Sequence, residues 1–105
     1  MGPRAVLPAI VVAVIGVLVW ASHHDRALRQ NIVEVVRGES RAEVEEILGN
    51  PTNAAACGSA TAAPAGCNLE YQYRYYLNFW HHEYEIIWLD KDGRVLGGQH
   101  VASSL

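Results

Sequence analysis

The sequence predicts an α+β fold, in which two N-terminal helices pack on a three-stranded antiparallel sheet and one hydrophobic membrane helix precedes them. Three observations lead to this fold class. The chain opens with a long uncharged apolar run, continues with apolar residues at helical spacing up to residue 48, and alternates apolar and polar residues from residue 69 onward. Helices and strands that are segregated along a chain are typical of α+β domains, whose helices cover one face of the sheet.

The first element is the apolar run from Ala5 to Ala21, which contains no charged residue. One interpretation is a cleaved signal peptide, because Val19-Trp20-Ala21 resembles the small-residue pattern before a cleavage site. The other is an uncleaved transmembrane anchor, at the lower limit of the length that spans a bilayer. We favour the anchor because helix-favouring residues continue past Ala21 and arginines follow soon after it. The expected domains are residues 1–21 as anchor or signal, 22–101 as one α+β domain and 102–105 as a frayed tail.

Two helices are expected next, from Ser22 to Arg37 and from Arg41 to Leu48. Apolar residues recur every three to four positions in both, which gives each helix one face to bury. The second helix has both ends marked. A serine before it and Glu43 three residues later form a capping box, and the Gly49-Asn50-Pro51 sequence stops it.

The two cysteines, Cys57 and Cys67, lie ten residues apart in a loop rich in Ala, Gly, Pro, Ser and Thr. In an exported chain such a pair is typical of a disulfide, whereas in a cytoplasmic domain the same residues would be free thiols. A metal site would need further ligands. The export signal favours the disulfide, and the disulfide in turn favours a domain outside the cytoplasm.

Three strands are predicted after this loop, over Leu69–Phe79, Tyr84–Leu89 and Arg94–Val101. The first alternates with period two, so its tyrosines share one face, which we expect to dock on the helices. Residues 80–83 and Asp90–Gly93 are the expected turns. The glutamates in these strands are expected on the solvated face: Glu70, Glu83 and Glu85.

The charge of the domain argues against two classes of partner. The chain has eight Lys and Arg and eleven Asp and Glu, and only Arg4 precedes Ser22, so seven basic and eleven acidic side chains leave about −4 on the domain. Nucleic-acid binding and docking on an anionic lipid surface both need clustered positive charge. No nucleic-acid partner is expected.

At Val35–Pro51 and Ile87–Val95 the chain resembles a known family. The first stretch contains a Gly-x-Ser helix start and a Leu-Gly-x-Pro stop, and the second contains Asp-Lys-Asp-Gly-Arg-Val. Together they resemble the SmpA/OmlA (BamE-like) family, over about Ile32 to Val101. The resemblance implies two helices on a three-stranded sheet, a shape shared with β-lactamase inhibitory proteins, and a role in outer-membrane assembly or envelope maintenance. The lipid-anchoring cysteine of that family is absent here.

No catalytic residue, cofactor or small-molecule substrate is expected. Ser40 is used as a helix cap, and the remaining serines lie in loops or the tail without a placed His and acid. Histidines near the second strand raise the hypothesis of a metal-binding module, which only their spacing supports. The aromatic residues that cannot all be buried are the candidate partner-binding residues: Tyr76, Trp80 and Trp88.

The sequence therefore favours a non-enzymatic cell-envelope protein, a periplasm-facing adaptor or structural domain on a single inner-membrane span. It would be periplasmic if the signal were cleaved. Its expected partners are the membrane and envelope proteins. The alternative is an inhibitor-like domain that binds a periplasmic enzyme through its aromatic sheet face, and the metal-binding module is the third hypothesis.

Overall fold

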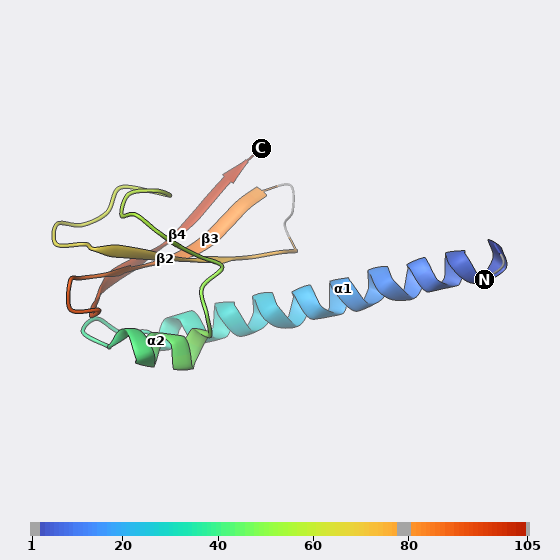
Figure 1. Cartoon of the computed structure of the whole chain (residues 1–105), viewed down its shortest axis with the longest axis horizontal. Coiled ribbons are helices and arrows are strands. Elements are labelled where there is room, and N and C mark those ends of the chain that lie inside the picture. Colours follow the sequence, from blue (N-terminus) through green and yellow to red (C-terminus); the bar gives the residue numbers. More distant parts are fainter. Residues whose placement is uncertain (1–2, 78–80, 105) are drawn as a thin grey trace.

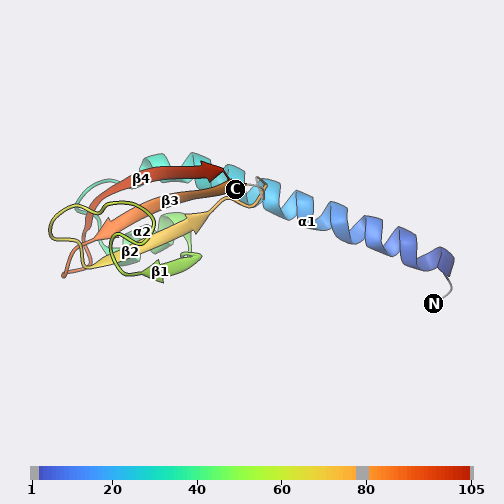
Figure 2. The same ribbon diagram turned by 90° about the horizontal axis from the view of Figure 1, so that it is seen from above.

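The computed structural model describes residues 3–77 and 81–104 and has the predicted α+β architecture (Figure 1). A long helix, α1 (Pro3–Asn31), leads through a short 3₁₀ helix, η1 (Ile32–Glu34), to a second helix, α2 (Arg41–Leu48). Four strands follow, β1 (Asn53–Ala55), β2 (Leu69–Arg74), β3 (His81–Leu89) and β4 (Val95–Ser104). The C-terminal part of α1 and all of α2 lie on one side of the sheet, and the rest of α1 projects away from it (Figures 1 and 2).

The apolar segment of residues 5–21 and the expected Ser22–Arg37 helix are one continuous helix in the structure. α1 is 29 residues long and crosses Ala21–Ser22 without interruption. The reason is visible in the sequence, because no glycine or proline lies between Gly16 and the end of α1. The helix ends at Asn31, six residues before the predicted Arg37, and η1 replaces its last turn.

The prediction for α2 is confirmed at both ends. The Ser40 hydroxyl accepts a hydrogen bond from the Glu43 amide at 3.2 Å, which caps the first turn. Gly49 ends the helix with a φ of 78°, a conformation that only glycine adopts without steric cost, and its amide donates to the Glu45 carbonyl at 2.7 Å. The capping box departs from the usual pattern, since the Glu43 carboxylate accepts from the Ser40 hydroxyl at 3.1 Å.

The sheet has four antiparallel strands in the order β1-β2-β3-β4, so the prediction of three strands is wrong. The additional strand, β1, lies in the segment expected to be loop and pairs Asn53 with Gln72. Its alanine-rich sequence has no alternation, and only the neighbouring β2 makes it a strand.

The bounds of the other strands also differ from those predicted. β2 ends at Arg74, and positions 78–79 of the longer predicted strand lie outside the described residues. β3 begins at His81, where a turn was expected. β4 reaches Ser104, past the expected end at residue 101, because its last residues continue the ladder with β3 down to the His81–Ser104 pair.

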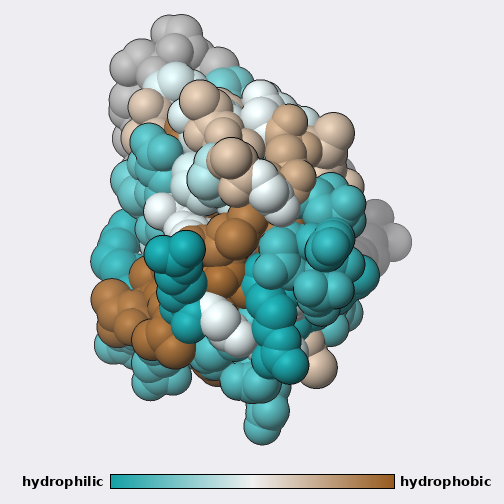
Figure 3. Space-filling model, turned by 90° about the vertical axis from the view of Figure 1, so that its left-hand side faces the viewer, coloured by the Kyte–Doolittle hydropathy of each residue, from teal (hydrophilic) through white to brown (hydrophobic). Residues whose placement is uncertain are grey.

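The core lies between the helices and one face of the sheet, as the alternation in β2 predicts. Three tyrosines of β2 and its continuation, Tyr71, Tyr73 and Tyr75, are almost completely buried there. They pack with residues from α1, α2, β3 and the start of β4: Leu28, Val44, Ile87, Leu89 and Val95. The loop between β1 and β2 passes over the opposite face (Figure 2). The end of the molecule farthest from the N-terminus is hydrophilic over much of its surface, with strongly apolar side chains in the centre and at the lower left of the view (Figure 3).

Candidate functional site

The candidate site is the junction at which α1 leaves its apolar run and enters the domain. The side chains of the run are exposed from Val6 to Trp20, whereas Ala21, Asp25 and Leu28 are buried. Their spacing of four and three residues places the buried side chains on one face of the helix. Figure 1 shows that this part of α1 passes under the sheet, so the same rigid helix carries both the exposed apolar segment and a part of the core.

Asp25 is the central residue of this junction. Its carboxylate accepts hydrogen bonds from the Tyr76 amide at 2.9 and 3.1 Å and from the Leu77 amide at 2.9 Å. These amides follow β2, where the chain leaves the sheet and has no ladder partner for them. A buried carboxylate needs donors and these amides need an acceptor, so the contact satisfies both.

Three aromatic rings add to the contact between α1 and the chain that follows β2, on the side of Asp25 nearer the apolar run. Trp20 stacks on His24 with ring centres 5.4 Å apart, and Tyr76 lies 5.3 Å from Trp20 and 4.9 Å from His24. His24 Nε2 lies 3.0 Å from the Arg74 carbonyl oxygen, a hydrogen-bonding distance. The end of β2 is therefore held to α1 by backbone, carboxylate and ring contacts together.

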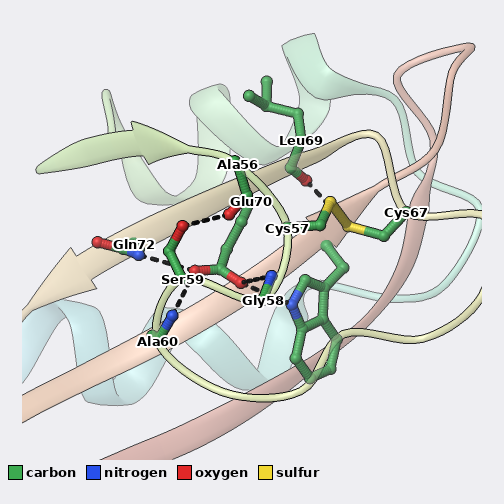
Figure 4. The surroundings of a disulfide bond; sticks show 10 residues. Ala56, Cys57, Gly58, Ser59, Ala60, Cys67, Leu69, Glu70 and Gln72 are labelled. Carbon is green, nitrogen blue, oxygen red and sulfur yellow. Dashed lines mark hydrogen bonds between the residues drawn. A yellow bond between two sulfur atoms is a disulfide. The ribbon is translucent and has the colours of Figure 1, made fainter.

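A second polar centre lies on the opposite face of the sheet, around Glu70 and the disulfide Cys57–Cys67 (Figure 4). The Glu70 carboxylate accepts from the Gly58 and Ala60 amides at 3.1 Å each, from Gln72 Nε2 at 2.7 Å and from Trp88 Nε1 at 3.0 Å. The prediction that Glu70 faces solvent is wrong, since its side chain is completely buried. The disulfide loop folds over that face and supplies two of the four donors.

Glu85 is also buried, although the sequence predicts a solvated side chain. It accepts from the Tyr75 hydroxyl at 2.9 Å, and its carboxylate oxygen lies 2.6 Å from His100 Nδ1. The other ring nitrogen of His100 lies 3.0 Å from a carboxylate oxygen of Glu83. The Arg29 guanidinium lies over the Tyr75 ring at 5.1 Å, which links this group to α1.

Burial raises the pKa of the core tyrosines above the ordinary value of 10. For Tyr73, burial is reinforced by the nearby charge of Glu45. For Tyr75, the hydrogen bond to Glu85 raises the pKa further, because that bond needs the protonated hydroxyl. For Tyr71, burial and the bond to Glu45 outweigh the opposing effect of Arg41.

The structure places the predicted site residues in different surroundings. The disulfide Cys57–Cys67 is confirmed. Tyr76 is half-buried in the junction, and Trp80 lies outside the described residues. Trp88 is only 7% exposed and its indole N–H donates to Glu70, so its ring offers little surface to a partner.

The metal hypothesis finds no support in the described residues. Across residues 3–77 and 81–104, no three His, Cys, Asp or Glu side chains are placed to hold an ion. His23 and His24 lie on α1, and His100 on β4 contacts the glutamates of β3, Glu83 and Glu85.

Two residues of these centres, Asp25 and Glu70, have no assigned role in the sequence-based prediction. The burial of Asp25 could have been predicted, because it lies at helical spacing between Ala21 and Leu28 and therefore on the face of the helix that these apolar residues bury. The burial of Glu70 could not, since it depends on a loop whose path the local sequence does not determine.

Comparison with known proteins identifies no relative. No family model matches the chain, and no curated protein or solved structure matches it either. The likeness to the SmpA/OmlA family therefore remains a prediction from the motifs quoted above, and function has to be argued from the structure itself.

Proposed function

We propose that this chain is a non-enzymatic cell-envelope protein whose helix α1 anchors it in the inner membrane and holds the α+β domain at the periplasmic surface as an adaptor. The observation that carries the proposal is the junction, where one uninterrupted helix joins the exposed apolar segment to the domain core. A flexible tether would leave the domain free to tumble, whereas a continuous docked helix fixes its height and orientation.

The length of α1 supports this arrangement. Its exposed part, residues 4–20, spans about 26 Å at 1.5 Å per residue, close to the roughly 30 Å of the hydrocarbon core of a bilayer, and the rest of the helix enters the domain. The helix has the length and composition of a membrane span, and its apolar part is almost entirely unburied. Trp20 lies where that part ends, a position at which aromatic residues favour the membrane interface.

The same junction favours an anchor over a cleaved signal. Cleavage after Ala21 would remove Trp20 from its contacts with His24 and Tyr76, and would remove the buried Ala21 from the domain. It would also place a charged new terminus three residues before Asp25. A segment that is discarded has no need to contribute to the fold of the mature domain.

The disulfide supports the periplasmic side. Disulfides persist in oxidising compartments and are rare in the cytoplasm. Outer-membrane assembly or envelope maintenance is the role that the motif resemblance suggests for an adaptor in this place. An inhibitor acting through an aromatic sheet face is less well supported, because the helices cover the core tyrosines and Trp88 is buried.

Intact mass spectrometry of the protein extracted from membranes tests the anchor and the compartment together. We expect the mass of a chain that retains residues 1–21, with no alkylation of Cys57 or Cys67 until reductant is added. A mature chain that begins at Ser22 would overturn the anchor. Alkylation without reductant would overturn the periplasmic location. The double variant Cys57→Ser/Cys67→Ser is the control for the specificity of alkylation.

A crosslinking experiment tests the adaptor role. We expect affinity purification from crosslinked envelopes to recover membrane or periplasmic proteins with the wild-type chain. A variant with Asp25→Ala, in which α1 loses its carboxylate contact with the end of β2, should recover less. Recovery of no envelope protein would contradict the role while leaving the anchor intact.

A further inference from the structure

We infer that the open edge of β4 is a strand-addition site, which binds an extended peptide segment of an envelope protein beside a groove that has one apolar wall. Within residues 3–77 and 81–104, β4 is the last strand of the sheet, and β3 is its partner on one side only. The inference rests on the proposed function, because it identifies the kind of partner that the adaptor would bind.

The register shows which backbone groups face this edge. In an antiparallel ladder, alternate residues of a central strand bond to one neighbour and then to the other. The Glu83 carbonyl accepts from the Tyr75 amide and the Leu89 carbonyl from the Asn68 amide, so the odd-numbered residues of β3 bond on the β2 side. Their partners on β4 therefore direct their N–H and C=O groups outward: Gly98, His100 and Ala102.

This edge has few of the features that normally prevent strand pairing. The backbone groups of its first residue already have partners, since the Val95 carbonyl accepts from the Gly38 amide at 2.8 Å and the Val95 amide donates to the Glu39 carbonyl at 2.9 Å. A bulge lies opposite Trp88 and Leu89. Beyond it, residues 97–104 contain no proline, lysine or acidic residue, and residues 98–100 and 102–103 are exposed. Natural edges of this length are usually protected by such residues.

A groove of about 310 Å³ runs beside the same edge on the helix side of the sheet. Ile32, Val33 and Val35 form its apolar wall, and Ile87 and Gly98 lie on the sheet side. Polar side chains line the rest of the groove: Arg37, Glu85, Gln99 and His100. A side chain at position 98 is sterically excluded, because its Cβ would lie 2.7 Å from the Ile86 carbonyl oxygen. Because residue 98 has no side chain, the space beside it stays open, and an apolar side chain of an added strand can enter the groove there.

The expected partner follows from these features. Main-chain hydrogen bonds to Gly98, His100 and Ala102 provide affinity for any extended segment, and the groove selects an apolar residue at alternate positions. The net charge of about −4 on the domain, from seven basic and eleven acidic side chains, disfavours an acidic segment. An uncharged or basic extended segment with alternating apolar residues fits best.

A second copy of the chain is a poorer occupant. β4 begins at Val95, which contacts Gly38 beyond the C-terminal end of α1. Farther along β4, Val101 pairs with Tyr84 and Tyr84 with Arg74, which contacts His24 in the middle of α1. β4 is thus opposite in direction to α1 (Figure 2). Antiparallel pairing of two β4 strands would point their α1 helices in opposite directions, which two anchors inserted from one side of a membrane cannot adopt.

The test uses the full-length protein in lipid nanodiscs and dodecapeptides displayed on phage as the probe. We expect enriched peptides with alternating apolar residues, and binding at least tenfold weaker to Ala102→Pro and to Val33→Glu. The proline removes an outward N–H without breaking a bond to β3, and the glutamate places a charge in the groove wall. Val36→Glu is the matched control, because Val36 is 57% exposed and does not line the groove.

The thermal unfolding midpoint of each variant shows whether it folds, and Val33→Glu tests the site independently if the proline variant does not. No enrichment over empty nanodiscs would overturn the inference, as would equal binding to wild type and both variants. A dimer that Ala102→Pro converts to a monomer would also overturn it, in favour of self-association. These outcomes do not depend on which side of the membrane the domain occupies, so they are separate from the test of the proposed function.

Discussion

At the scale of single residues, the polar side chains that matter most are those that the strand pattern predicts to be exposed. Glu70 lies between Leu69 and Tyr71, and simple alternation places it toward water. In the structure it is buried and accepts four hydrogen bonds from the loop, the sheet and an indole. A sheet face that the alternation predicts to be exposed can therefore be buried when a loop folds over it.

Glu70→Ala should lower the free energy of unfolding by about 3 kcal/mol, because it leaves two loop amides and the Trp88 indole N–H without their acceptor. Denaturant unfolding of the purified chain measures the loss. Glu46→Ala is the control, since Glu46 is exposed and should change stability by less than about 0.5 kcal/mol. Amide exchange at Gly58 and Ala60 should accelerate in the first variant only. Unchanged exchange there would show that Glu70 does not hold the loop.

At the scale of elements, α1 has two roles that the sequence separates into two helices. Its first part is an exposed apolar helix, and its second part contributes Leu28 and Asp25 to the folded domain. The contact with the end of β2 makes the two parts one rigid unit. The disulfide loop is the corresponding element on the other face, where its Gly58 and Ala60 amides donate to the buried Glu70.

Asp25→Ala should destabilise the domain by about 2–3 kcal/mol, because the amides of Tyr76 and Leu77 lose their acceptor in a buried position. Asp25→Asn keeps one carbonyl oxygen and should lose less. Asp92→Ala in the exposed β3–β4 turn is the matched control and should be nearly neutral. Denaturant unfolding in detergent micelles measures the free energy of unfolding of each of the three variants and so gives their order of stability. Equal stability of Asp25→Ala and Asp92→Ala would contradict a fastening role for Asp25.

At the scale of the whole molecule, the core is a layer of tyrosines between two helices and a sheet. Because burial raises the pKa of Tyr71, Tyr73 and Tyr75, the folded state holds their protons more tightly than the unfolded state. Their contribution to stability is fully present below about pH 10, the unfolded value, and decreases as the pH rises above it. The domain should therefore unfold in alkali, and tyrosinate absorbance should appear as it does so.

Tyr73→Phe tests this linkage. Near neutral pH the variant should be about 1 kcal/mol less stable, because it loses the hydrogen bond from the Tyr73 hydroxyl to the Gly49 carbonyl at 2.9 Å. Above about pH 10 the difference should shrink, since the unfolded wild type gains stability by ionising Tyr73 and the variant cannot. Denaturant unfolding across pH 7–12 gives the difference. A constant difference over that range would contradict a raised pKa.

Local sequence determines much of this protein: the apolar helix, the capped α2, the β2–β4 meander with its tyrosine face, and the disulfide pair. Each depends on periodicity, end signals or spacing within a short stretch, which act wherever the stretch is placed. Tertiary structure alone decides the additional strand β1, the burial of Glu70, Glu85 and Trp88, and the open edge of β4. Each of these depends on what another segment covers or leaves uncovered, which is a property of the packed chain.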